Sequence, residues 1–325
     1  MKKKYIKDLT YGETIDRESF SLAHCNGVKH EKDIEVVFSD RTGTVKAAVP
    51  LSVIPEGISL ETMEGNVFTV SGVILMDNQM PLLRVKELAV CSDFVPAELY
   101  QGLSKEKILA YIQDISELKC MIKHPGYRKL VDECLTPENL DKLAHLPATL
   151  GYYGKYSGGA LAATDSVARM CMTSMVAYTK RGNGLTTAAP DWNALISASL
   201  LFMLGNIKYF RPDPPFKKSD LGVALGIFPA LQSTIEDCIR GKDIGLTDVE
   251  FSTLLNALNV SVSTRTEVRA VSKEGPILRH CISLYAECDA LDWECATHET
   301  QEGEDGYYYS KKLSRYVMTA NGGAC

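Results

Sequence analysis

The first third of the chain carries the hydrophobic pattern of β-strands. Residues 34–49 form two loosely alternating apolar stretches on either side of Asp40-Arg41-Thr42-Gly43, which is typical of a hairpin in which Gly43 supplies the turn conformation. Residues 66–90 repeat this arrangement around Asp77-Asn78. About five short strands within residues 1–91 predict a small barrel or sandwich.

After residue 91 the apolar positions recur at the three- and four-residue spacing of helices. Ser104 is a candidate N-cap, and Thr136-Pro137 predicts a second helix start with proline in the first turn. We therefore assign residues 92–145 to a helical connector between two domains. Strands followed by helices indicate a multi-domain α+β protein.

Residues 146–296 form the predicted helical domain, and residues 297–325 form a C-terminal tail. The apolar segments that predict its helices lie near 160–179, 192–209, 221–239, 247–262 and 276–295. In the tail, aromatic and basic residues interleave from Tyr307 to Tyr316, which fits a nucleic-acid contact, a subunit contact or a terminal hairpin.

Composition narrows the function classes. The formal net charge is −6, so any binding of a polyanion needs a local basic patch. The ten cysteines are scattered along a large chain, which favours reduced thiols in a cytoplasmic protein. The densest apolar run, 195–204, is shorter than the roughly 20 residues that span a bilayer, and we expect no contact with a membrane.

Five short sequence segments occur in a particular order and spacing, and together they are more informative about family than any one of them alone. They are Tyr5-Ile6-Lys7-Asp8-Leu9, Ser39-Asp40-Arg41-Thr42-Gly43, Ser92-Asp93-Phe94-Val95-Pro96, Leu146-Pro147-Ala148-Thr149 and Tyr156-Ser157-Gly158-Gly159-Ala160-Leu161. Together they resemble the YhaM-type 3′–5′ exoribonucleases, also described as CMP-binding factors, over nearly the whole chain. The resemblance implies an N-terminal OB-type β-barrel in residues 1–91 and an all-α HD-like domain in residues 146–296.

The same resemblance marks where this chain departs from the family. The His-Asp pair that holds the metal in an HD domain aligns with Phe202 and Met203, and further histidine positions align with Ala163 and Ile227. One aspartate of the set survives as Asp289. Apolar side chains cannot hold a divalent cation, so the resemblance implies a degenerate site without metal or cofactor, filled with core residues.

A divergent metal-dependent exoribonuclease remains the enzymatic alternative. It would have to rebuild a metal site from Asp165, Asp289, Asp292 and His280. His280 and Asp289 lie about 13 Å apart along one helix and cannot share an ion unless that helix breaks. A polar helix face for Asp165, and a cap or an ion pair with Arg279 for the other two aspartates, are simpler interpretations.

Six residues of the first domain are candidates for a surface that stacks bases and contacts phosphates. They are Tyr5, Phe38, Arg41, Lys46, Arg84 and Lys86. The competing interpretation places Phe38 in the core and leaves the charges solvated. Residues 1–91 hold eleven Lys and Arg against thirteen Asp and Glu, which weakens the case for a polyanion surface.

From these observations we expect a catalytically silent HD-domain pseudoenzyme of exoribonuclease lineage. Its predicted partners are single-stranded RNA or DNA, a protein, or a second copy of the chain. A purely structural interaction scaffold is the remaining possibility.

Overall fold

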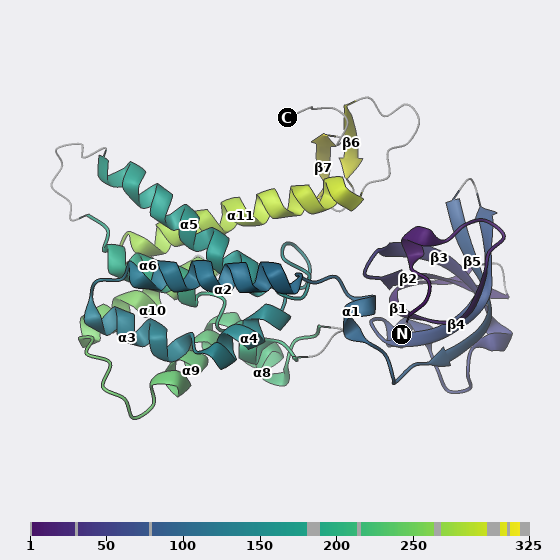
Figure 1. Ribbon diagram of the computed structural model, residues 1–325, viewed down its shortest axis with the longest axis horizontal. Helices are drawn as coiled ribbons and strands as arrows, with labels where there is room; N and C mark the ends of the chain where they lie inside the picture. Colours follow the sequence, from purple (N-terminus) through teal and green to yellow (C-terminus); the bar gives the residue numbers. More distant parts are fainter. Residues whose placement is uncertain are drawn as a thin grey trace. The chain divides into compact units, whose positions relative to one another are not determined.

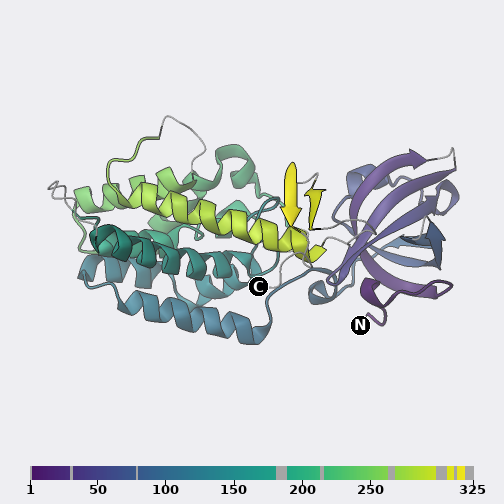
Figure 2. The same cartoon turned by 90° about the horizontal axis from the view of Figure 1, so that it is seen from above.

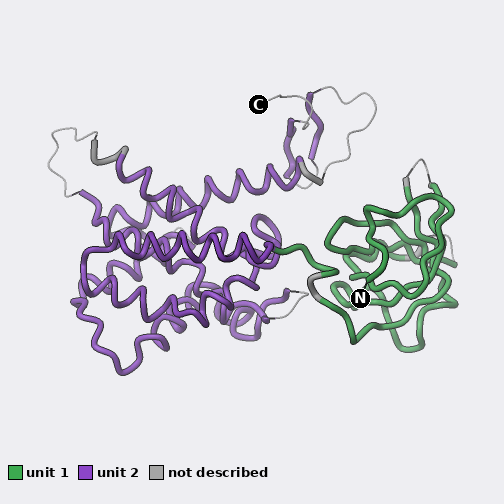
Figure 3. The backbone as a smooth tube through the Cα atoms, viewed as in Figure 1, with its two compact units in different colours: residues 1–102, 213–215 green, residues 103–212, 216–325 purple. Residues whose placement is uncertain are grey.

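The computed structural model describes residues 2–29, 32–77, 80–180, 189–212, 216–262, 268–297, 306–310 and 313–318 (Figure 1). The chain divides into two compact units. Unit 1 covers residues 1–102 and 213–215, and unit 2 covers residues 103–212 and 216–325 (Figure 3).

Unit 1 is a closed five-stranded barrel. Its strands are β1 (Thr14–Lys29), β2 (Asp33–Asp40), β3 (Gly43–Pro50), β4 (Val67–Asp77) and β5 (Met80–Val90), in the order β1-β2-β3-β5-β4. The long strand β1 pairs with β4 through its first half and with β2 through its second half. β3 and β5 pair in parallel and close the barrel. This strand order is that of an OB-type barrel, as the sequence predicted.

Strand alternation builds the barrel interior. The inward positions of β2 and β3 are Val36, Phe38, Val45, Ala47 and Val49, all at most 5% exposed. Gly72 allows close packing between β4 and β5, because a Cβ atom there would lie 2.4 Å from the carbonyl oxygen of Arg84. Between β3 and β4 the chain forms the short 3-10 helices η2 (Leu51–Val53) and η3 (Leu60–Met63).

The two hairpins predicted from the sequence are present, but Gly43 has a different role in the first. It pairs with Asp40 in the strand ladder and has no positive φ. The side chain of Asp40 holds the turn instead, because its Oδ1 accepts from Thr42 N at 2.8 Å and from Thr42 Oγ1 at 2.6 Å. In the second hairpin Asp77 pairs with Met80, while Asn78 lies outside the described residues.

Unit 2 is helical apart from a small hairpin (Figures 1 and 2). Its helices are α2 (Lys105–Cys120), α3 (Pro125–Cys134), α4 (Pro137–His145), α5 (Gly159–Lys180), α6 (Trp192–Leu201), α7 (Asn206–Tyr209), α8 (Asp220–Leu225), α9 (Ile227–Ile239), α10 (Asp248–Val262) and α11 (Glu274–Thr297). The short helix α1 (Pro96–Leu99) belongs to unit 1. Both predicted caps are formed, because Ser104 Oγ accepts from Lys107 N and Thr136 Oγ1 accepts from Asn139 N.

Helices α2 to α4 share one hydrophobic core with the later helices. Ile115, Leu118, Leu130 and Leu143 are buried in the same cluster as residues of α5, α6 and α10. The segment predicted as a connector therefore contributes to the body of unit 2, and the division between the units falls at residues 102 and 103.

Two segments predicted as single helices are interrupted. The first breaks between α6 and α7, where Gly205 lies so close to Leu231 that a Cβ atom would meet its backbone nitrogen at 2.9 Å. The second breaks at Gly226, whose φ of 88° lies outside the helical region and separates α8 from α9. Apolar periodicity continues across both breaks, which is why the sequence pattern did not reveal them.

The C-terminal segment contains the hairpin β6 (Tyr307–Ser310) and β7 (Arg315–Met318). The buried side chains of Tyr308, Ser310 and Val317 form its inner face, and Tyr308 Oη donates to the carbonyl oxygen of Glu294 at 3.1 Å. This hairpin packs on α11, as one of the three possibilities raised by the sequence requires.

Candidate nucleic-acid interface and the centre of the helical unit

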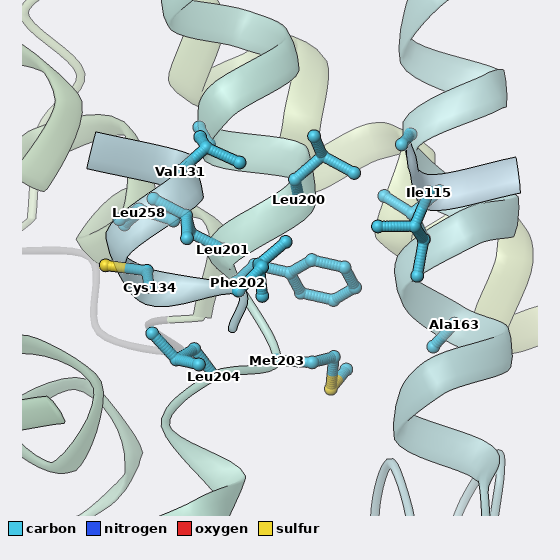
Figure 4. Packing of buried hydrophobic residues seen from close by; sticks show 14 of the residues in the cluster. Ile115, Val131, Cys134, Ala163, Leu200, Leu201, Phe202, Met203, Leu204 and Leu258 are labelled. Atoms are coloured by element: carbon cyan, nitrogen blue, oxygen red, sulfur yellow. The ribbon is translucent and has the colours of Figure 1, made fainter. Parts of the chain in front are cut away.

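Phe202 and Met203, which align with the metal-binding pair of HD domains, lie in the hydrophobic core of unit 2. Phe202 is 1% exposed and Met203 is 5% exposed. The Phe202 ring points toward Ile115 of α2, and Ala163 of α5 lies nearby with no exposure (Figure 4). Phe202, Met203 and Ala163 present only carbon and sulfur atoms here, whereas sites for hard divalent cations use carboxylate, carbonyl or water oxygens.

Ile227 does not join this core. It is the first residue of α9, is half-buried, and is absent from the described apolar cluster. The expectation that Ile227 fills the same cavity is therefore wrong, because the break at Gly226 places it at the end of a helix. Asn206, just beyond the Phe202-Met203 pair, is buried and donates from Nδ2 to the carbonyl oxygen of Pro147 at 2.8 Å.

Asp289 caps a turn of the backbone. Its Oδ2 accepts a hydrogen bond from Gly154 N at 2.8 Å. Burial, followed by the nearby charge of Asp289, raises the pKa of Tyr156 to about 12 and also raises the pKa of Tyr153. Burial, followed by Tyr156 and then Asp289, raises the pKa of Tyr285. The raised pKa values favour the protonated form of these three tyrosines.

Asp165 forms an ion pair inside unit 2. It is 4% exposed, and Arg169 Nε lies 2.9 Å from its Oδ1, while Arg169 Nη2 lies 2.8 Å from Asp114 Oδ1. Asp165 was predicted to lie on a polar helix face, and it does lie beside the charged Arg169, but its carboxylate is buried. Burial raises the pKa of Asp165, and Arg169 opposes that shift.

The other candidate ligands do not converge. His280, Asp289 and Asp292 all lie on the continuous helix α11, and His280 and Asp292 are exposed. Arg279 donates from Nε to the carbonyl oxygen of Val260 at 2.7 Å. Within the described part of the chain, no group of three or more His, Cys, Asp or Glu side chains could hold a metal ion.

In the barrel, Phe38 must be removed from the candidate interface. It has no exposure, and its ring packs between Phe20 and Phe68 at centroid distances of 6.2 and 6.4 Å. It points inward from β2, as the competing interpretation proposed, and cannot stack on a base.

Tyr5 and Arg41 form a stacked pair beside the β2–β3 turn. The guanidinium carbon of Arg41 lies 4.5 Å from the centroid of the half-buried Tyr5 ring. Behind them, the fully buried Nζ of Lys2 lies 3.4 Å from Asp40 and 3.5 Å from the centroid of the Phe20 ring. Burial lowers the pKa of Lys2, and the charge of Asp40 opposes this shift.

Lys46, Arg84 and Lys86 project from the outer face of neighbouring strands. Lys46 pairs with Leu82 across the β3–β5 ladder, and Arg84 lies two residues farther along β5. Arg84 Nη1 contacts Asp33 Oδ2 at 2.5 Å, so part of its charge is neutralised. Lys46 and Lys86 are exposed, and neither has an ion-pair partner among the residues that the structure describes. The barrel therefore brings three of the six predicted residues to one face.

The outer face of the β6–β7 hairpin is aromatic. Tyr307, Tyr309 and Tyr316 are 64%, 53% and 73% exposed, and Met318 pairs with Tyr307 on the same face. The rings of Tyr309 and Tyr316 meet edge to face with centroids 5.3 Å apart. Exposed apolar surface of this kind on a small hairpin is typical of a contact site.

Sequence reasoning missed two ion pairs. The Asp165–Arg169 pair has the four-residue spacing of a helical ion pair, so it could have been found from the sequence. The Lys2–Asp40 pair joins residues 38 positions apart, so no local sequence pattern predicts it.

No family model matches the sequence, and no curated protein matches it. Several solved structures are similar to the chain. The second OB-fold domain of replication protein A from Methanococcus maripaludis is 14% identical with a TM-score of 0.22, and the match covers 29% of this chain and 99% of that one. An OB domain from Methanosarcina mazei is 15% identical with a TM-score of 0.25, covering 30% and 92% of the two chains.

A third similar structure is asparaginyl-tRNA synthetase from Pyrococcus horikoshii, at 17% identity and a TM-score of 0.23, covering 47% of this chain and 39% of that one. Structural similarities with sequence identities and TM-scores this low give no information about function. The OB-type assignment of unit 1 rests on its own strand order and pairing. In the part of the chain that is described, no helix has the length and apolarity needed to cross a membrane.

Proposed function

We propose that this chain is a catalytically silent relative of the YhaM-type exoribonucleases that binds single-stranded nucleic acid through its barrel. The observation that supports this most is the pair of exposed lysines, Lys46 and Lys86, beside Arg84 on the outer face of β3 and β5. Lysines without acidic partners are available to phosphates, and their contacts release counterions from the nucleic acid.

The neighbouring positions on this face suit a chain of unpaired bases. Val37 of β2, Lys46 of β3 and Leu82 of β5 are in register across three strands, and His24 of β1 continues the row. Apolar and ring surfaces can contact bases while the lysines contact the backbone. We expect little sequence preference, because none of these side chains presents a planar pair of donors and acceptors to a base edge.

The silent part of the proposal rests on how the interior of unit 2 is filled. Hydrolysis of a phosphodiester by an HD-type centre needs a metal ion that generates hydroxide. Phe202 and Met203 fill the corresponding positions, and the nearby carboxylates of Asp165 and Asp289 already bind Arg169 and Gly154 N.

The binding experiment uses the full chain and a fluorescein-labelled single-stranded RNA and DNA, with affinity measured by anisotropy at several salt concentrations. The double variant Lys46→Ala/Lys86→Ala should bind more weakly and reduce the magnitude of the slope of log affinity against log salt by about 1.4, roughly 0.7 for each lost phosphate contact on a single strand. The control, Lys105→Ala/Lys107→Ala on the exposed start of α2, makes the same change in net charge. An equal loss in both double variants, or no binding by the parent chain at low salt, contradicts the proposal.

The exposed tyrosine face of the β6–β7 hairpin favours one second candidate, an interaction scaffold. A protein partner or a second copy of the chain would cover Tyr307, Tyr309 and Tyr316. Light scattering on the parent chain and on Tyr309→Ser/Tyr316→Ser tests the second-copy form. A larger parent mass that the double variant reduces to that of a monomer supports it, and a monomeric parent removes it.

A further inference from the structure

Two cysteines that are far apart in the sequence meet at the ends of α3 and α9. Cys134 is the last residue of α3, and Cys238 lies one residue before the end of α9. The two thiols shift each other's pKa in opposite directions, and the side chain of Asn139 contacts both residues. Cys134 has no exposure, whereas Cys238 is half-buried. One residue of the pair is thus partly accessible to solvent, and the other is not.

The residues around this pair supply hydrogen-bond donors and a cation. Asn139 Nδ2 lies 3.6 Å from Cys238 Sγ and donates to the carbonyl oxygen of Cys134 at 2.8 Å, so one amide bridges both cysteines. Lys242 Nζ donates to the carbonyl oxygen of Cys238 at 2.8 Å and pairs with Glu133 at 2.6 Å.

These contacts favour the thiolate form of Cys238. The hydrogen bond from Cys134 lowers the pKa of Cys238 most, and Asn139 and Lys242 lower it further against the opposing effect of burial. Asp237 acts in the other direction, but it is paired with Lys208 and Arg240. Hydrogen bonding to Cys238, together with burial, raises the pKa of Cys134, which therefore stays a thiol. A partly exposed thiolate beside a protonated thiol is the arrangement of an attacking and a resolving cysteine.

We propose that Cys238 and Cys134 form a redox-active dithiol that a small-molecule disulfide oxidises to an intramolecular disulfide. The Cys238 thiolate attacks one sulfur of the small disulfide, forms a mixed disulfide and releases one small thiolate. Cys134 then loses its proton to solvent and attacks Cys238 Sγ, which releases the second small thiol. Two protein thiols are oxidised and one disulfide is reduced to two thiols, so atoms and electrons balance.

A second thiol pair in the same unit provides a matched control. Cys171 of α5 and Cys281 of α11 also shift each other's pKa in opposite directions, and Ser174 Oγ lies 3.5 Å from Cys281 Sγ. Both thiols are buried, at 0% and 4% exposure. Cys171 and Cys281 should therefore be oxidised much more slowly, because a small disulfide cannot reach a thiolate that is buried.

The test exposes the reduced full chain to oxidised glutathione, stops the reaction with acid, blocks free thiols with a maleimide and maps the peptides by mass spectrometry. Cys134 and Cys238 should disappear from the free-thiol pool together and appear as one cross-linked peptide pair, before Cys171 and Cys281 react. Cys134→Ser should trap the mixed disulfide on Cys238, and Cys238→Ser should leave Cys134 as a free thiol.

Asn139→Ala should slow the oxidation about fivefold, the equivalent of one lost hydrogen bond of about 1 kcal/mol. Oxidation should also raise the melting temperature of the parent chain and leave that of Cys238→Ser unchanged, because the new bond cross-links two helices that are far apart in the sequence. Oxidation of Cys171 and Cys281 at the same rate overturns the proposal. So does a Cys134→Ser chain whose Cys238 reacts no faster than the exposed Cys120.

Discussion

The barrel and the helical unit use their polar residues in different ways. In the barrel, strand alternation turns Lys46, Arg84 and Lys86 outward, while the buried positions are mostly apolar and include the polar residues Lys2, Glu18, Ser21 and Asp40. In the helical unit, Asp165 and Asp289 reach into the fold and are held there by Arg169 and Gly154 N. The outer face of the barrel thus carries two lysines, Lys46 and Lys86, without an ion-pair partner among the described residues, whereas the two carboxylates inside the helical unit are already hydrogen-bonded.

The difference bears directly on function. A binding surface needs side chains whose hydrogen-bonding capacity is unused, and the outer face of β3 and β5 retains such groups. A metal centre needs several converging ligands in one cavity, and the space beside Ala163 holds Phe202 and Met203 instead. This contrast underlies our proposal that the barrel binds the ligand and that the interior of the helical unit has a structural role.

The largest effect on stability is expected when a buried ring is removed from either of the two hydrophobic cores. Phe202→Ala and Phe38→Ala each remove a fully buried ring and should each lower the free energy of unfolding by about 3–5 kcal/mol. Hydrogen exchange should show the loss of protection confined to unit 2 for Phe202→Ala and to unit 1 for Phe38→Ala. If Phe202→Ala costs less than about 1 kcal/mol, the centre of unit 2 is not a packed core and its assignment fails.

A smaller effect is expected at the buried ion pair. Arg169→Met leaves the charge of Asp165 without its partner and should destabilise the chain by about 1–2 kcal/mol at pH 7, less than for a fully buried pair because Arg169 is 49% exposed. The variant raises the already elevated pKa of Asp165 further. Because the folded state then binds its proton more tightly than the unfolded state, stability falls as pH rises from the ordinary aspartate pKa through the folded value.

Denaturant unfolding at a series of pH values tests whether the stability of Arg169→Met falls as the pH rises. The difference between the parent chain and Arg169→Met should shrink toward acid, where Asp165 is protonated in both states. Arg169→Met/Asp165→Asn removes the titrating group, so it should lose this pH dependence. A difference that grows toward acid would mean that Asp165 is not the group responsible.

The smallest effect concerns the cap at Gly154. Asp289→Ala removes the acceptor for Gly154 N and should cost about 1 kcal/mol in thermal unfolding. The exposed Asp292→Ala, three residues away on α11, should change stability by less than about 0.5 kcal/mol. Equal effects of the two variants would show that the Gly154 contact contributes nothing.

Local patterns predicted much of this fold. Alternation identified the barrel strands, and the Ser104 and Thr136 caps marked helix starts, because these signals depend on neighbouring residues. The breaks at Gly205 and Gly226 escaped prediction, since the first depends on the approach of Leu231 and the second on a backbone conformation that glycine permits but does not require.

The candidate site was less predictable for the same reason. Phe38 and Lys46 both lie in alternating strands, and only the closure of the barrel decides which of them points inward. Ile227 aligned with a ligand position, yet the break at Gly226 leaves it at the end of a helix. The burial of Asp165 depends on packing between helices, although its partner Arg169 is visible in the sequence.

The most direct test of the account follows binding and cleavage in one sample. The full chain is mixed with a labelled single-stranded RNA and manganese at low salt; anisotropy reports binding, and a denaturing gel reports the length of the RNA. The account predicts that the RNA is bound and stays as long as in the buffer control. Manganese-dependent shortening from the 3′ end that Asp289→Ala abolishes would contradict it.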